Sequence, residues 1–197
     1  MIKTKADLRH YLEQTCIAYG VPKLSFLRTF VLRRLFSDNN YEFMVNLRKL
    51  EYWMAQTGLV AKLMRYYRLW CHAQLRAKTG IELNPFCAEE GLHVSHGKIV
   101  VSSIAKIGKN CKICSDVTIG GQGRYDVDGA PILGDRVFVS SGARIIGNVH
   151  VADGVVIGAN AVVVKDILEP NTTWAGIPAR KVSDSGSNWY LREAFRE

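Results

Sequence analysis

The fold is decided by residues 101–121, which read VSSIAKIGKNCKICSDVTIGG, and by residues 131–163, which read PILGDRVFVSSGARIIGNVHVADGVVIGANAVV. In both stretches an aliphatic residue returns at every sixth position. These positions are Val101, Ile107, Ile113, Ile119, Leu133, Val139, Ile145, Val151, Ile157 and Val163. A fixed internal period takes precedence over local propensities when a fold is inferred from sequence. The chain is therefore treated first as a repeat protein.

A second set of small or apolar residues follows the first set by four positions. It comprises Ala105, Cys111, Val117, Gly123, Val137, Ala143, Val149, Val155, Ala161 and Ile167. Gly, Asn and Asp stand between the two sets and suit tight turns. A period of six fits neither an α-helix nor a hairpin meander. It predicts a coil with three flat faces per turn, whose aliphatic side chains point inward and stack on the next coil. The alternative, a Gly- and Val-rich β-sandwich, would alternate with period two and with irregular spacing.

The composition divides the chain in two. Residues 1–80 carry 14 Lys and Arg against 5 Asp and Glu, whereas residues 81–197 carry 12 against 13. Helical spacing recurs in the first part, at Leu24, Leu27, Val31 and Leu35 and again from Leu59 to Trp70. We expect about four α-helices in residues 1–80, a β-coil in residues 81–182, and a tail with a short helix in residues 183–197.

Several classes of protein are disfavoured at this stage. Hydrophobic residues make up 48% of the chain, enough for a core, and 5 cysteines in 197 residues imply no disulfide framework. Cys111 and Cys114 form a C-x-x-C pair, but Cys111 stands at an inward position, so we assign it to packing. The sequence shows no signal peptide and no run long enough to span a bilayer. A cytoplasmic location is the expectation.

Four segments resemble a known family. They are GIELNP at residues 80–85, GLHVSHGKIVV at residues 91–101, VTIGG at residues 117–121 and AGIPAR at residues 175–180. Together with the period of six, they resemble the hexapeptide-repeat acyltransferases, and in particular the serine acetyltransferase group. The resemblance covers residues 80–182 closely and the helical part in outline. It implies a left-handed parallel β-helix that follows an α-helical domain.

The resemblance also implies catalytic residues. Transfer of an acetyl group from a thioester to a hydroxyl needs a general base, and histidine titrates near working pH. His96 matches the family's histidine base. Glu82 matches the acidic residue that orients this base, although the family usually has aspartate there. His93 forms H-x-x-H with His96, but no third ligand has a recognisable spacing, so we expect no metal and assign His93 to the pocket lining.

Acetyl-CoA is the implied co-substrate, bound in a groove between two β-helices. Matching positions predict contacts to its pantetheine arm from backbone near Gly121, Ser141 and Ala159. Lys165 and Arg180 are the candidates for its phosphates, with Lys181 beside them. The loop at residues 120–131 interrupts the repeat, and in the family such a loop reaches toward a neighbouring subunit. A homotrimer is expected, with a hexamer of paired trimers as the alternative.

Departures from the family pattern bear on the acceptor. Ser95 replaces the aspartate that precedes the base, and Gly129-Ala130-Pro131 replaces an Arg-His-Pro sequence. An amino-acid zwitterion would lose its charged partners there. We therefore expect a sugar hydroxyl of capsule or exopolysaccharide synthesis, with Ser95 and His93 as substrate contacts. Serine O-acetyltransferase is the alternative. A non-catalytic β-helix used only in assembly and a metal-dependent hydratase are the remaining alternatives.

The positive charge of residues 1–80 suggests a partner. Lys23, Arg28, Arg33 and Arg34 interleave with apolar residues, and Arg65, Arg68, Arg76 and Lys78 occur in a stretch that also holds Tyr66, Tyr67 and Trp70. Our hypothesis is a peripheral contact with an anionic membrane at its inner face, which would bring the enzyme to a lipid-linked acceptor. A solvated basic face combined with an oligomer interface is the competing interpretation. No nucleic-acid-binding motif accompanies the charge.

Overall fold

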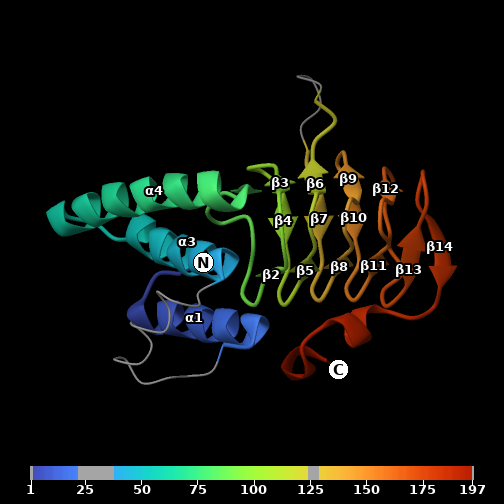
Figure 1. Ribbon diagram of the computed structural model, residues 1–197, viewed down its shortest axis with the longest axis horizontal. Helices are drawn as coiled ribbons and strands as arrows, with labels where there is room; N and C mark the ends of the chain where they lie inside the picture. The colour runs from blue at the N-terminus through green and yellow to red at the C-terminus, as the bar shows by residue number, and fades with distance from the viewer. Residues whose placement is uncertain (1, 22–37, 124–128, 197) are drawn as a thin grey trace.

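A computed structural model describes residues 2–21, 38–123 and 129–196. Three α-helices come first: α1 (Lys5–Tyr19), α3 (Asn39–Ala55) and α4 (Leu59–Thr79). Short strands follow to the end of the coil, and two 3-10 helices, η1 (Ser187–Tyr190) and η2 (Glu193–Phe195), form the tail. Figure 1 shows the helices at one end of the molecule and the stacked strands beside them. The predicted helix around residues 24–35 and the basic residues Lys23, Arg28, Arg33 and Arg34 lie outside the described residues.

The strands form three sheets. Sheet A has the order β1 (Ile81–Glu82), β3 (Ile99–Val101), β6 (Val117–Gly120), β9 (Arg144–Ile146) and β12 (Val162–Val163). Sheet B has the order β10 (His150–Val151), β7 (Ile132–Leu133) and β4 (Lys106–Ile107). Sheet C has the order β14 (Arg180–Ser183), β13 (Thr173–Ala175), β11 (Val156–Ile157), β8 (Phe138–Val139), β5 (Lys112–Ile113) and β2 (His93–Val94).

These sheets are the three faces of one coil. Every strand pair within them is parallel except β13 with β14, which is antiparallel. Ile99 lies opposite Val117, so one turn of the coil uses three hexads. Thr118 lies opposite Arg144, a longer step because the loop that begins after β6 adds residues to that turn. The predicted three-faced coil is thus confirmed.

The inward positions of the repeat form the core. All ten aliphatic positions of the first set are at most 4% exposed. Nine of the ten positions of the second set are buried as well, Cys111 among them, and only Gly123 is exposed because it stands in the loop. The packing role predicted for Cys111 is confirmed. Each coil covers the apolar edge of the next, as the six-residue period predicts.

The helical part shares this core. Phe43, Met44 and Leu47 of α3 pack in the same buried cluster as the first coils. Arg48, only 1% exposed, donates from Nη1 to the Glu51 carboxylate at 2.9 Å and to the carbonyl oxygen of Ala88 at 2.8 Å. A buried guanidinium requires such compensation. This ion pair anchors α3 to the segment that leads into the coil, so the helices hold the first coil in place.

Candidate active site

His96 lies at a corner of the coil, between β2 on sheet C and β3 on sheet A. Its side chain is exposed. Gly97, the next residue, has φ +69°, and a Cβ on it would lie 2.9 Å from the Cβ of Ser115. Because Gly97 has no side chain, this corner packs closely on the next coil, directly above Ser115.

The register of sheet C aligns three small residues on successive coils, next to the corner that carries His96. Val94 lies opposite Ile113, Ile113 opposite Val139, and Val139 opposite Ile157. Two residues further along, the same register places Ser115, Ser141 and Ala159 in one column, here named the corner column. At its first coil the column meets Gly97, since Ile99 lies opposite Val117 on sheet A, and His96 directly precedes that glycine. Ser115 Oγ donates to Ser141 Oγ at 3.2 Å. The column is an edge of small residues that runs parallel to the coil axis and ends at Gly97, beside His96.

The helices position the segment that carries His96. The Tyr19 hydroxyl of α1 donates to the carbonyl oxygen of Val94 at 3.2 Å and accepts from the Val94 amide at 3.1 Å. Asn40 of α3 donates from Nδ2 to the carbonyl oxygens of Val94 and Ser95, both at 3.3 Å. These contacts replace the strand that β2 lacks on its outer side. Neither Tyr19 nor Asn40 was found from sequence, because nothing local links them to residues 94–95.

Asp38 also belongs to this neighbourhood. It is the N-cap of α3, and its Oδ1 accepts from the Asn40 amide at 2.9 Å. Asn40 in turn contacts Ser95, the residue before His96. The Asp38 carboxylate is thus held beside Asn40, whose side chain contacts the segment that carries His96. The place of Asp38 is set by the N-terminus of α3, which it caps.

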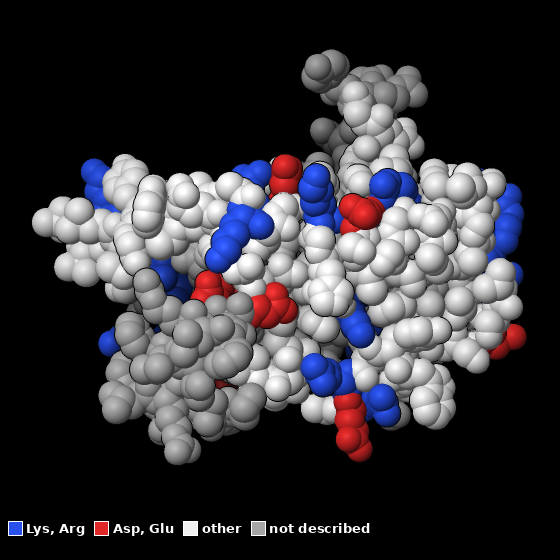
Figure 2. All heavy atoms as spheres, in the orientation of Figure 1, with Lys and Arg blue, Asp and Glu red and all other residues white. Residues whose placement is uncertain are grey.

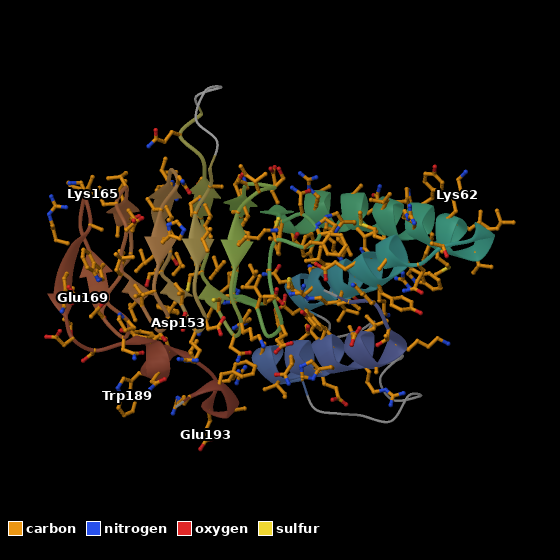
Figure 3. All side chains as sticks on the ribbon, turned by 180° about the vertical axis from the view of Figure 1, so that it is seen from behind. Lys62, Asp153, Lys165, Glu169, Trp189 and Glu193 are labelled. Atoms are coloured by element: carbon orange, nitrogen blue, oxygen red, sulfur yellow. The ribbon has the colours of Figure 1, made fainter. Side chains whose placement is uncertain are left out.

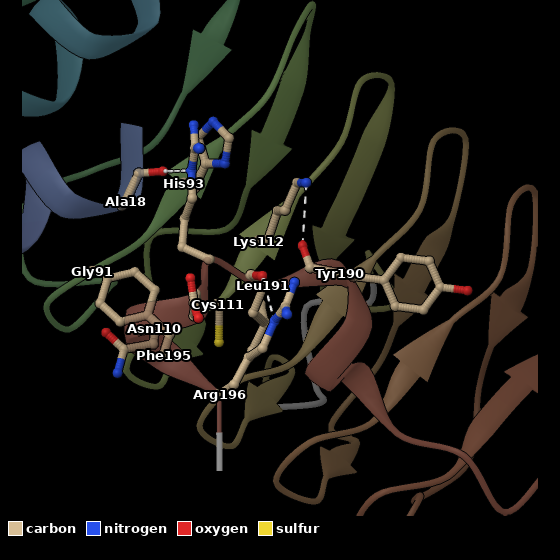
Figure 4. A pocket seen from close by; sticks show the side chains of 12 residues that line it. Ala18, Gly91, His93, Asn110, Cys111, Lys112, Tyr190, Leu191, Phe195 and Arg196 are labelled. Atoms are coloured by element: carbon tan, nitrogen blue, oxygen red, sulfur yellow. Dashed lines mark hydrogen bonds between the residues drawn. The ribbon is translucent and has the colours of Figure 1, made fainter. Parts of the chain in front are cut away.

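His93 lines a cavity whose lining does not include His96. The His93 ring packs against Tyr19 with a centroid distance of 4.5 Å and lines this cavity of about 320 Å³ between α1, sheet C and the tail (Figure 4). Burial lowers the pKa of His93 to about 4, and the positive charges of Lys112 and Arg192 act in the same direction. The imidazole is therefore neutral near pH 7. Its predicted substrate contact stays a prediction.

Glu82 lies on β1, opposite Val100. Its carboxylate is 56% exposed and lies 3.7 Å from Nη2 of Arg76, near the end of α4. In the described part of the chain, no hydrogen bond joins Glu82 to His96. The pairing of these two residues, which the sequence predicted, stays a prediction.

The predicted coenzyme contacts fall on two different edges of sheet A. Ser141 and Ala159 stand in the corner column, at the edge shared with sheet C. Gly121 and Lys165 stand at the opposite edge. Ile119 and Val163 both lie opposite Ile145, and Gly121 and Lys165 each come two residues after one of them, so they share one position of the coil. Lys165 and Arg180 line one cavity of about 140 Å³ together with Trp174. Figure 3 shows Lys165 on the last coils, far from the helices.

Lys181 is already paired. It contacts the carboxylates of Glu169 and Asp184, the latter at 2.7 Å. These two acids compete with any phosphate for its charge. Arg180 donates to the carbonyl oxygen of Ala179 at 3.1 Å, which leaves it the better phosphate candidate of the two.

No group of three or more His, Cys, Asp or Glu side chains that could hold a metal ion occurs in residues 2–21, 38–123 and 129–196. Among the same residues, no helix combines the length and the apolar character needed to cross a membrane.

The fold and the corner column define a class: a parallel β-helix of hexapeptide repeats preceded by α-helices. No family model matches the chain. It is similar to a serine acetyltransferase of Synechococcus elongatus, with 36% identity over 121 residues that cover 60% of this chain and 49% of that protein. A serine acetyltransferase of Helicobacter pylori is 39% identical over 107 residues, which cover 53% of this chain and 62% of that protein.

Solved structures agree in fold. Soybean serine acetyltransferase complexed with serine superposes with a TM-score of 0.66 at 28% identity, over 89% of this chain and 69% of that one. The fold is therefore the left-handed parallel β-helix, as predicted. By sequence and fold, the chain is a relative of the serine acetyltransferases, the group that the sequence motifs resembled. It spans about half to three-fifths of the length of these curated relatives. They do not support the predicted capsule-type sugar subgroup.

Proposed function

We propose that the chain is an acetyl-CoA-dependent O-acetyltransferase with His96 as its general base. The observation that carries the proposal is an exposed imidazole at the end of the corner column, on a coil similar to that of serine acetyltransferases. A general base must reach the acceptor's proton, so an exposed ring suits the task. The small side chains of the column leave room for a thioester arm beside it.

The chemistry needs one proton carrier. His96 takes the proton of the acceptor hydroxyl as the hydroxyl oxygen bonds to the thioester carbonyl carbon. The carbon–sulfur bond then breaks, and the CoA thiolate takes the proton from the imidazolium. In this proposal Glu82 accepts a hydrogen bond from the other ring nitrogen and holds the reactive tautomer. That role requires Glu82 to exchange its exposed contact with Arg76 for one with His96.

Backbone near Ser141 and Ala159 would bind the pantetheine arm along the corner column. Lys165 and Arg180 would meet the phosphates, and their shared cavity with Trp174 supports this part of the proposal because it combines two cations with an aromatic ring. Gly121 lies on the same edge as Lys165. One arm that uses both edges fits best in a groove between two coils, where one chain offers the corner column and its neighbour the Gly121 edge. We therefore propose a homotrimer, with a hexamer as the alternative.

L-serine is the acceptor that the relatives favour, since the two described above are named serine acetyltransferases. This reverses the sugar acceptor that the sequence departures suggested. An amino group needs a carboxylate nearby. Ser95 does not supply one, but Asp38 does, because Asn40 ties the start of α3 to the Ser95 backbone. Asp38 is our candidate for reading the amine.

A neutral sugar hydroxyl is the second candidate, and a specific observation favours it. Ser95 and Gly129-Ala130 are uncharged, so the described residues offer no obvious cation for an acceptor carboxylate at these positions. A neutral acceptor needs only the base, hydrogen-bond donors and space.

The decisive experiment follows release of free thiol from acetyl-CoA with L-serine and, separately, with a panel of sugars. The variant is His96→Ala, and the control is His150→Ala, which also removes an exposed histidine but from β10 on sheet B. Loss of a general base typically lowers kcat by about 10²- to 10⁴-fold. We expect that loss for His96→Ala alone, and CoA should raise the Tm of both variants. Unchanged kcat in His96→Ala refutes the proposed base.

The acceptor is tested by Asp38→Asn. If Asp38 reads the amine, KM for L-serine rises at least about tenfold, the scale of one lost charge-assisted bond, whereas KM for acetyl-CoA stays constant. Turnover of a sugar but not of L-serine would exclude serine without affecting the assignment of His96. If neither acceptor reacts and CoA fails to raise the Tm, the chain is a non-catalytic β-helix.

A further inference from the structure

The outward side of α4 carries an apolar surface that no described residue covers. It consists of six large side chains, each more than half exposed: Leu59, Val60, Leu63, Tyr66, Tyr67 and Trp70. Spacings of three, four and seven residues put them on one arc of the helix, here named the α4 outer face. The opposite side, with buried Ala61 and His72, packs toward α3. Six exposed large apolar side chains on one arc of a helix are typical of an interaction surface.

All the excess charge of the described helical part lies on α4. This helix has five basic residues, Lys62, Arg65, Arg68, Arg76 and Lys78, and no acidic residue. Residues 2–21 and 38–58 contain five basic and five acidic residues, so they balance to zero. In Figure 2 the far-left end of the molecule, over the first turns of α4, is white and blue without red. Figure 3 shows Lys62 at this outer end, pointing away from the molecule.

The positive charge of α4 favours an anionic partner over a second copy of the chain. A second copy seated α4 against α4 would bring together two helices that each carry five basic residues and no acidic one, and among the described residues only Arg76 is paired to an acid, Glu82. Anionic lipid headgroups supply the missing negative charge, while tyrosine and tryptophan suit the boundary between headgroups and acyl chains. Because no described helix can cross a membrane, the helix would lie along the surface. We propose that the α4 outer face docks the protein onto an anionic lipid surface.

This proposal is independent of the proposed acetyl transfer. The sequence suggested a membrane contact anywhere in residues 1–80, and the proposal places this contact on the α4 outer face. Arg65 and Arg68 also donate to Gln56 and Asn46, at 3.2 and 3.4 Å, so the variants that test the surface should leave these two residues in place.

The test is co-sedimentation of the full chain with sucrose-loaded vesicles of phosphatidylcholine alone or with about 30% phosphatidylserine. The double variant Leu63→Ser/Trp70→Ser removes the centre of the α4 outer face, and Lys62→Glu reverses a charge beside it. The control is Trp189→Ser, which removes a tryptophan that is 81% exposed but lies on η1, away from α4. Molar mass by light scattering is measured for each variant, and circular dichroism verifies folding.

Wild type and the control should sediment with the anionic vesicles at low salt and lose this binding at high salt. Neither should bind vesicles of phosphatidylcholine alone. The double variant and Lys62→Glu should partition at least about tenfold more weakly. Absence of wild-type binding overturns the proposal, and so does equal binding by the double variant. If wild type fails to bind vesicles and the molar mass falls in the double variant, the α4 outer face is assigned to contacts between copies.

Discussion

The Tyr19 hydroxyl closes the outer edge of the strand that precedes His96. Strand β2 ends sheet C, and its amides at His93 and Ser95 bond to the next coil, at 2.9 Å each. The Val94 amide faces the other way, where the Tyr19 hydroxyl accepts its hydrogen bond at 3.1 Å. Burial raises the pKa of Tyr19 far above its usual range, so the hydroxyl stays protonated at every working pH.

Tyr19→Phe removes this hydroxyl and leaves the ring. The Val94 carbonyl oxygen retains Asn40 as a donor, but the Val94 amide loses its partner in a fully buried residue. A buried polar group without a partner costs about 1–3 kcal/mol. For a chain of this size, each kcal/mol corresponds to about 2–4 °C in Tm. We expect a loss of roughly 2 kcal/mol and a Tm lower by about 4–8 °C.

The assay is urea unfolding with a thermal melt. Tyr190→Phe is the matched control, because Tyr190 is 47% exposed and its ring stacks on Phe138, a contact that the substitution retains. We expect the control to stay within about 0.5 kcal/mol of wild type. The kcat of Tyr19→Phe should also fall several-fold, since Val94 lies two residues from His96. A loss below about 0.5 kcal/mol would show that the Tyr19 hydroxyl does not satisfy the Val94 amide.

Two further predictions concern the same corner. Gly97→Ala should lower the free energy of unfolding by about 1–2 kcal/mol for its positive φ alone, and by more because the new Cβ would lie 2.9 Å from Ser115. Gly123→Ala is the control, because Gly123 has φ +73° but no atom within 4 Å, so its loss measures the cost of the backbone conformation alone. Equal losses for the two variants in urea unfolding would show that the contact with Ser115 costs nothing. Since burial lowers the folded-state pKa of His93 to about 4, the unfolded chain binds the proton first, and the free energy of unfolding should fall as pH drops from about 6.5 to 4, by roughly 3 kcal/mol at most. His93→Gln should flatten this slope in melts between pH 7 and 4; an unchanged slope would assign the pH dependence to other groups.

The repeat could be predicted because its information is local. A side chain at every sixth position must enter the core of a three-faced coil, and the ten aliphatic positions are all buried. His96 and Glu82 could be proposed from short motifs for the same reason. The acceptor could not be predicted in this way, because its recognition depends on charged residues outside those motifs. Asp38, for example, reaches the neighbourhood of Ser95 only through the start of α3.

What the sequence determined by itself is the coil, its three hexads per turn and its inward residues, since periodic burial leaves its mark along the chain. What only the tertiary structure decided is how the edges of the coil are satisfied and which residues meet there. Tyr19 bonds a residue 75 positions away, and Arg48 bonds one 40 positions away. Such pairs obey no period. They exist because a buried amide or guanidinium needs a partner, whatever part of the chain supplies it.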